Sequence, residues 1–170
     1  ALTGHQVFST VHANDVTGAI SRLLDMDVSK ETIGPAINLI MGQRLVRRLC
    51  DKCKKPAGVD AGFAGKIKHY VDMLPARVVR DGLSATGLCE PVGCGACNAT
   101  GYRGRIALFE LFPVGVDAEK MIVSGAGAAD LYAFAVARGM VTMQQDGVIK
   151  ALHGITTVAE IETATGPIAV

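Results

Sequence analysis

Cys50-Asp51-Lys52-Cys53 and Cys94-Gly95-Ala96-Cys97 are the two stretches that decide how this chain is organised. Each is a Cys-x-x-Cys turn, whose sulfurs face one point while the intervening backbone amides are free to donate to them. Two such pairs supply four thiolates, the number and spacing that a tetrahedral Zn²⁺ site needs. With all four positions of the ion taken by sulfur, none stays open for water or substrate. We therefore expect a structural metal held by Cys50, Cys53, Cys94 and Cys97.

Other uses of these cysteines are weighed against zinc. They include four unrelated buried thiols, two disulfides in a secreted protein, and a thiol oxidoreductase that uses either pair as a redox dithiol. The paired spacing favours zinc over all of these. The fifth cysteine, Cys89, is left over and is predicted to be a free thiol, with a substitute metal ligand as the alternative.

The composition places few limits on function. The chain has 170 residues, 49% of them hydrophobic, no Trp and a net charge of +1. This near neutrality argues against binding in the manner of a polycation or polyanion. No apolar run approaches the ~18–20 residues of a membrane span, and the start shows no signal peptide. Reduced thiols suit the cytosol. Because Ala1 stands where a Met would begin a protein, we expect a segment of something longer.

Hydrophobic periodicity and capping residues predict an α/β chain with a helical last third. Short strands are expected at residues 6–11, 43–49 and 106–112, the last with Glu110 set within it. Helices are expected at residues 16–26, from Ser29 to about Met41, and at 64–73, 117–123, 128–138, 140–152 and from Thr157 on. The stretch between the cysteine pairs is predicted to be an insertion between ligands. Thr157 and Glu160 have the spacing of a capping box.

A basic cluster surrounds the first cysteine pair, with only Asp51 opposing it; its members are Arg44, Arg47, Arg48, Lys52, Lys54 and Lys55. One interpretation is a nucleic-acid footprint beside a zinc ribbon. The other is electrostatic, because Zn²⁺ with four thiolates carries a net charge of −2 that nearby cations stabilise. Few aromatic residues interleave with these charges, and the electrostatic interpretation is preferred.

No complete active site can be read from the residues. There is no Gly-x-x-x-x-Gly-Lys-Ser/Thr loop and no strand that ends in an acidic pair for Mg²⁺. His12 follows a predicted strand, at the edge of a sheet where α/β proteins bind ligands. A lone histidine after a strand is more often a capping or surface group. His5 has a weaker claim still.

Several segments, in order along the chain, resemble the hexameric ATPases of type II secretion and type IV pilus assembly. Residues 3–15 (TGHQVFSTVHAND) are similar to the family's histidine box, and residues 18–26 continue it. Residues 43–56 resemble the segment that enters the family's tetracysteine module. Residues 94–105 (CGACNATGYRGR) are similar to the segment that leaves it. Phe109-Glu110-Leu111 and the segments 145–150 and 154–161 resemble the strand and helices that follow.

The resemblance implies an α/β fold in three parts. Residues 1–49 would be the C-terminal part of a RecA-like ATPase core, residues 50–104 a tetracysteine zinc module, and residues 105–170 a strand with a small helical C-terminal domain. His12 takes the position of the histidine that senses the γ-phosphate side of the site; His5 belongs to the same box with a weaker claim. The Walker A and B elements that bind ATP and Mg²⁺ lie upstream in the family, so this segment is not expected to hydrolyse ATP alone.

The implied parent is a cytoplasmic homo-hexamer, peripheral to the inner membrane, that contacts platform and assembly proteins of a secretion or pilus machine. No nucleic acid is expected. The alternative from another class is a zinc-ribbon module that binds nucleic acid, which salt-dependent affinity for DNA or RNA would reveal. Removal of zinc is expected to unfold residues around 50–105 while much of the C-terminal helical signal survives.

Overall fold

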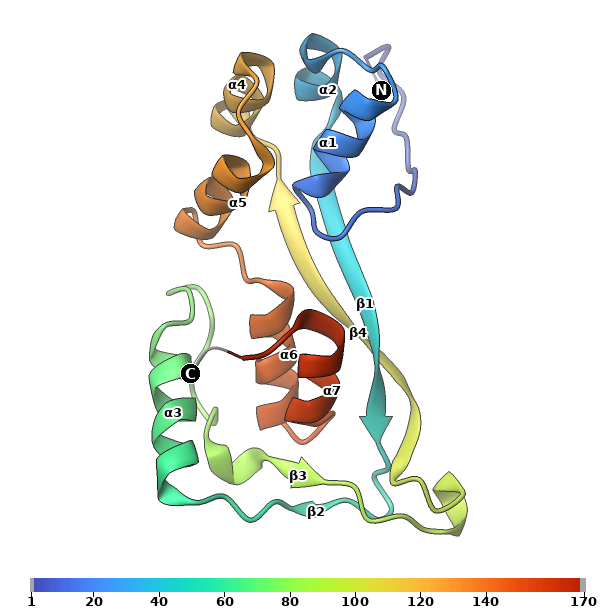
Figure 1. Cartoon of the computed structure of the whole chain (residues 1–170), viewed down its shortest axis with the longest axis vertical. Helices are drawn as coiled ribbons and strands as arrows, with labels where there is room; N and C mark the ends of the chain where they lie inside the picture. The colour runs from blue at the N-terminus through green and yellow to red at the C-terminus, as the bar shows by residue number, and fades with distance from the viewer. Residues whose placement is uncertain (1, 169–170) are drawn as a thin grey trace. The chain divides into compact units, whose positions relative to one another are not determined.

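A computed structural model describes residues 2–168 of the chain. Its elements, shown in Figure 1, are α1 (Gly18–Asp25), α2 (Lys30–Ala36), β1 (Leu39–Leu49), β2 (Lys55–Pro56), α3 (Ala61–Asp72), the 3₁₀ turn η1 (Ala85–Gly87), β3 (Cys89–Glu90), the 3₁₀ turn η2 (Gly95–Cys97), β4 (Tyr102–Pro113), α4 (Val116–Ser124), α5 (Ala128–Ala137), α6 (Met143–Leu152) and α7 (Val158–Thr165). Strands β1 and β4 form one two-stranded sheet, and β2 pairs antiparallel with β3 in another.

The chain forms two compact units, each built from separate stretches of sequence. Unit 1 comprises the residues up to Gly42 and Glu110–Met140, and unit 2 comprises Gln43–Phe109 and the residues from Val141 on. Each unit thus combines stretches from both sides of the boundaries expected at residues 49 and 104. The three-part functional division remains a prediction, as do the RecA-like core and the helical C-terminal domain.

Unit 1 packs α1, α2, α4 and α5 around an apolar core that includes Val16, Ile20, Ile33, Phe112, Ile122 and Leu131. Helices α2 and α4 meet closely, because Gly34 leaves no side chain between them. A Cβ at Gly34 would stand 2.9 Å from Cγ2 of Val123. The helix predicted from Ser29 does begin there, but it ends at Ala36. Pro35 lies in its last turn, and residues from Leu39 on belong to β1 instead.

The strand predicted at residues 6–11 is not formed. These residues have no regular secondary structure and are exposed, with Phe8 87% accessible. A strand needs a neighbouring strand for its amides and carbonyls, and the described residues offer none to this segment. The β-branched residues of this segment favour a strand, but composition alone cannot supply a pairing partner.

Unit 2 has its own core, made by α3, α6 and α7. Ile67, Tyr70 and Leu74 of the stretch between the cysteine pairs pack with Val148, Leu152 and Ile161. The predicted helix at 64–73 is confirmed and starts earlier, because Asp60 caps it by accepting from the Phe63 amide at 2.9 Å. The insertion therefore shares a core with the helices at the end of the chain.

Two helix N-caps differ from prediction. Thr157 does cap α7 by accepting from the Glu160 amide, but the Glu160 carboxylate does not return to the cap. The full capping box lies instead at α6, where Thr142 and Gln145 exchange both bonds and delay the helix start to Met143. Gly139 follows the C-cap of α5 with φ +86°, and Met140 donates to the Ala135 carbonyl.

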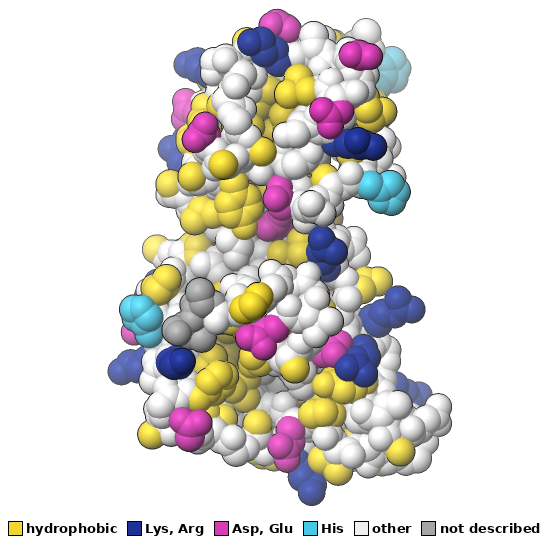
Figure 2. Space-filling view, viewed as in Figure 1, with side chains coloured by type: hydrophobic (Ala, Val, Ile, Leu, Met, Phe, Trp, Pro, Cys, Tyr) yellow, Lys and Arg dark blue, Asp and Glu magenta, His cyan; other side chains and the backbone are white. Residues whose placement is uncertain are grey.

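No helix among residues 2–168 is long and apolar enough to cross a membrane. Hydrophobic side chains still reach the surface at several places on the face drawn in Figure 2. The exposed ones include Val7, Phe8, Met26, Met73 and Val79.

Candidate metal centre

Strand β1 delivers the first pair of thiols. The strand ends at Leu49, whose amide donates to the carbonyl of Ile155 at 2.8 Å, and Cys50 follows at once. The chain then turns sharply, with the amides of Cys53 and Lys54 both donating to the Cys50 carbonyl. This turn brings Cys53 back beside Cys50, so both sulfurs face the same point.

The second pair lies on a tight turn that depends on glycine. Cys94 precedes η2, and both Cys97 and Ala99 donate their amides to its carbonyl. Gly93 and Gly101 bracket the turn with φ of +101° and +76°. A Cβ on Gly101 would lie 2.4 Å from Cβ of Pro91, so only glycine fits without a shift. The Gly101 carbonyl accepts from the Cys50 amide at 2.9 Å, which ties the two turns together.

The four predicted sulfurs come together in one cluster. The Sγ atoms of Cys50, Cys53, Cys94 and Cys97 all lie within 4.8 Å of one another. The Cys50–Cys94 separation is 4.0 Å, and the Cys53–Cys97 and Cys94–Cys97 separations are both 3.8 Å. A tetrahedral zinc–thiolate site with Zn–S bonds of ~2.3 Å has sulfur–sulfur edges of about 3.8 Å. The cluster therefore fits one tetrahedral metal ion, and its cysteines are free thiols in this structure.

Backbone amides act on the thiol of Cys97. Burial by itself would raise its pKa, but the amides of Cys94 and Gly101 donate to Sγ at 3.2 and 3.3 Å. Together with the thiols of Cys94 and Cys53 they lower the pKa of Cys97 to about 6. The pKa of Cys53 is instead raised to about 11, by burial and by the neighbouring thiols, against the backbone hydrogen bond of Gly93 that lowers it. The amide-rich second turn is thus suited to hold thiolate, the form that binds metal.

Part of the basic cluster is paired with acidic groups. Asp51 accepts from Lys54 at 2.9 Å and from Arg48 at 2.8 Å. The Lys54 hydrogen bond, followed by the charges of Lys54 and Arg48, lowers the pKa of Asp51. Lys54 also donates to the carbonyl of Gly154 at 2.8 Å. Arg48 and Lys54 therefore hold the first cysteine turn in place. Their pairing with Asp51 also reduces the repulsion between neighbouring cations that the sequence suggests.

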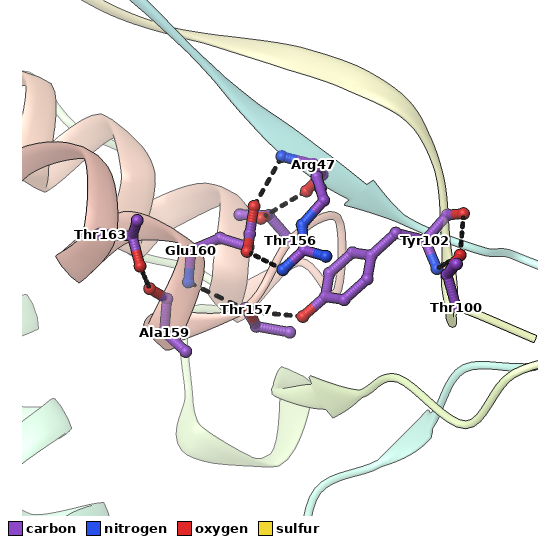
Figure 3. Close-up of polar contacts among 8 residues, drawn as sticks. All are labelled: Arg47, Thr100, Tyr102, Thr156, Thr157, Ala159, Glu160 and Thr163. Atoms are coloured by element: carbon purple, nitrogen blue, oxygen red, sulfur yellow. Dashed lines mark hydrogen bonds and ion pairs between the residues drawn. The ribbon is translucent and has the colours of Figure 1, made fainter.

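Arg47 has a partner that sequence proximity did not reveal. Figure 3 shows its guanidinium on the Glu160 carboxylate of α7, at 2.6 Å, and its backbone amide donates to the same group at 2.9 Å. The guanidinium also lies 4.1 Å from the centre of the Tyr102 ring. Tyr102 in turn hydrogen-bonds Thr157 at 3.2 Å. Asp51 is therefore not the only acidic group that opposes the cluster.

Cys89 does not belong to the four-sulfur group. It lies on β3 and donates weakly to the carbonyl of Gly87 at 3.7 Å. Its sulfur would be 2.9 Å from a Cβ placed on Gly154. The thiol therefore packs inside unit 2, and the predicted free cysteine is confirmed.

The histidines predicted as site residues lie on the irregular segment before α1. Both His5 and His12 are exposed, and histidine side chains stand at the surface in Figure 2. His5 hydrogen-bonds the Thr3 hydroxyl at 3.2 Å through Nδ1. The described residues place no second group of three or more metal-ligating side chains near them. The structure thus leaves their predicted role open.

Glu110, which sequence reasoning had noted without giving it a role, is only 3% exposed. Its Oε1 accepts from the Val16 amide at 3.0 Å. The available signal was a single acidic residue within the apolar run 106–112. Such a residue on a buried strand needs a partner, because an unpaired buried carboxylate is costly.

The chain is similar to known proteins over nearly its whole length. A family model described as type II/IV secretion system protein matches residues 1–163. A type IV pilus assembly ATPase of Myxococcus xanthus is 40% identical over 98% of the chain, and one of Thermus thermophilus is 38% identical over 97%. A type II secretion system protein E of Pectobacterium carotovorum is 37% identical over 97%. The chain spans 28%, 18% and 30% of these relatives, respectively. It belongs to the type II/IV secretion system protein family.

Proposed function

We propose that this chain is the C-terminal segment of a hexameric cytoplasmic ATPase that powers type II protein secretion or type IV pilus assembly. The family match across residues 1–163 is the observation that carries this proposal, because the relatives include proteins named as pilus assembly ATPases. The chain covers less than a third of those relatives, and in the proposed parent the ATP-binding loop and the Mg²⁺-binding strand lie in the part that precedes this segment.

The exposed segment at residues 6–11 supports a longer parent. Its apolar side chains Val7 and Phe8 are 61% and 87% accessible, and no described strand pairs with it. Preceding sequence that adds strands would bury these side chains and satisfy the backbone. Residue His12, at the end of this segment, would then face the nucleotide and donate a hydrogen bond to the γ-phosphate as charge develops there.

The role of His12 is tested in the full-length parent. His12→Ala is expected to lower kcat for ATP about 10²-fold, the range for loss of one charge-stabilising donor, while nucleotide binding persists. His5→Ala should have a smaller effect. His69→Ala, an exposed histidine on α3, is the matched control and should leave turnover unchanged. An unaltered rate in His12→Ala would remove the assigned role.

We also propose that the four-sulfur site holds structural Zn²⁺. The cluster offers four thiols with tetrahedral spacing and no other ligand, so the ion would tie β1 to the turn before β4 and supply no open position for chemistry. Elemental analysis should find about one zinc per chain. A metal-free protein with a redox-active dithiol at either pair would contradict this proposal and favour the oxidoreductase alternative.

The proposed parent contacts inner-membrane platform and assembly proteins and does not bind nucleic acid. The pairing of Arg47, Arg48 and Lys54 with acidic groups supports the absence of nucleic-acid binding against the zinc-ribbon alternative, because a cation already held by a carboxylate is less available to a phosphate. DNA titrations at low and physiological salt test it directly. Salt-dependent affinity at physiological ionic strength would favour the nucleic-acid module.

A further inference from the structure

Glu110 is a buried carboxylate that the proposed function leaves unexplained. It lies on β4 in unit 1, and only 3% of its surface is accessible. A carboxylate in such a place is retained only when its lone pairs have partners. The hydrogen-bond partners of Glu110 therefore indicate which segment it holds in place.

The partners of Glu110 lie at the start of α1. Its Oε1 accepts from the Val16 amide at 3.0 Å, a bond that is itself buried. Beside it, Asp15 accepts from the Gly18 amide at 2.7 Å and from the Thr17 hydroxyl at 3.0 Å. The two carboxylates together anchor the segment that runs from His12 into the helix.

Tyr132 of α5 completes the cluster. Burial raises the pKa of Tyr132 to about 12, and the charges of Glu110 and Asp15 and a side-chain hydrogen bond to Glu110 act in the same direction. The phenol therefore stays protonated and can donate a hydrogen bond to Glu110. With the Val16 amide, this gives the Glu110 carboxylate a second fixed donor.

Gly42 of β1 leaves the space that Glu110 occupies. A Cβ at Gly42 would stand 2.8 Å from Cγ and 3.1 Å from Oε1 of Glu110, and 3.2 Å from Cγ1 of Val16. Glu110 can thus lie against the β1 backbone only because residue 42 has no side chain. It also provides an independent way to displace the carboxylate without altering it.

From this geometry we infer that Glu110 is a positioning residue, which fixes the backbone at Val16 and so sets where His12 stands. The inference rests on the proposed ATPase function of the parent. Glu110 does not touch nucleotide; it holds the Val16 amide, and residues 13–16 connect that point to His12. A misplacement on the order of 1 Å at a reacting centre can cost about 10²-fold in rate.

The test uses the full-length parent with variants in matched pairs. Glu110→Ala is expected to lower kcat for ATP about 10- to 100-fold, with the KM for ATP unchanged. Glu110→Gln keeps an oxygen that accepts from Val16 and should recover most of the rate. Gly42→Ala should reproduce the loss by displacing Glu110. Gly58→Ala, where a Cβ would meet nothing within 4 Å, should behave as wild type.

Two further readouts separate positioning from a general loss of stability. Hydrogen exchange at residues 5–18 should be faster in Glu110→Ala and Gly42→Ala but not in Glu110→Gln. The double variant Glu110→Ala/His12→Ala should turn over no more slowly than His12→Ala alone, because both changes act on one group.

The outcomes distinguish this inference from the proposed function. If His12→Ala is slow while Glu110→Ala and Gly42→Ala keep the wild-type kcat, or if the double variant shows additive losses, the positioning role is overturned. If His12→Ala turns over normally, the role of His12 itself fails. Should Glu110→Ala not accumulate as folded protein, Gly42→Ala and Glu110→Gln decide the question by the same criteria.

Discussion

At the scale of single residues, Glu160 does more than its place at the start of α7 suggests. Its carboxylate, 12% exposed, accepts from both the guanidinium and the backbone amide of Arg47. The hydrogen bond from Arg47 lowers the pKa of Glu160, and this effect is larger than the opposing effect of burial. A turn of helix and the end of β1 are thereby joined by one side chain (Figure 3).

Replacing Glu160 should therefore destabilise the chain in a pH-dependent way. Glu160→Ala is expected to lower the free energy of unfolding by about 0.5–1.5 kcal/mol near neutral pH, because the hydrogen bonds to Arg47 are lost while water can reach the exposed Arg47 amide. A carboxylate with a lowered folded pKa stabilises above its unfolded pKa of about 4.3, and the contribution is lost as pH falls through the folded value. Urea unfolding at several pH values should show the difference from wild type shrinking in acid. A difference that is independent of pH would contradict the assignment.

Gly101 offers a second prediction at this scale. Its positive φ and its contact with Pro91 leave no room for a Cβ, and its amide donates to Cys97. Gly101→Ala should weaken metal binding about 10- to 100-fold, as loss of a supporting contact around ligands does. Gly95→Ala, in the same turn but facing open space, is the control. Competition with a chromogenic chelator measures both; equal affinities would show that Gly101 does not shape the site.

At the scale of elements, two helix-interior glycines should respond to alanine in opposite ways. A Cβ at Gly147 of α6 would lie 2.9 Å from Cγ2 of Ile161 on α7, so Gly147→Ala overpacks the α6–α7 contact and should cost about 1–3 kcal/mol. Gly65 of α3 faces open space, and Gly65→Ala should stabilise by about 0.5–1 kcal/mol. Thermal melts of both variants test this, and stabilisation by Gly147→Ala would show that α6 and α7 are not closely packed.

Element prediction succeeded where the signal is local. The strand that leads into Cys50, the strand holding Glu110 and the helix between the cysteine pairs all carry their own periodicity, and the cysteine spacing places four sulfurs together. Prediction failed at residues 6–11, because a strand depends on partners that sequence does not name. The Arg47–Glu160 pair joins positions 113 residues apart, so no local pattern contains it.

At the scale of the whole molecule, the shared core of unit 2 changes what metal removal should do. The sequence predicted loss of structure across residues 50–105 on zinc removal. However, α3 lies within that range and packs Ile67 and Tyr70 against Val148 and Ile161 of α6 and α7. Because this core contains no metal ligand, it should remain when the ion is lost.

We therefore expect chelation to loosen only the two cysteine turns. Hydrogen exchange should rise at residues 50–53 and 93–101, while α3, α6 and α7 stay protected and the far-ultraviolet dichroism keeps most of its helical signal. The helices of unit 1 have a separate core and should not respond. Cys53→Ser provides the matched variant, since it weakens the site without a chelator. Loss of protection in α3 together with α7 would show instead that the metal holds the whole unit and that the shared core does not stand without the turns that the ion closes.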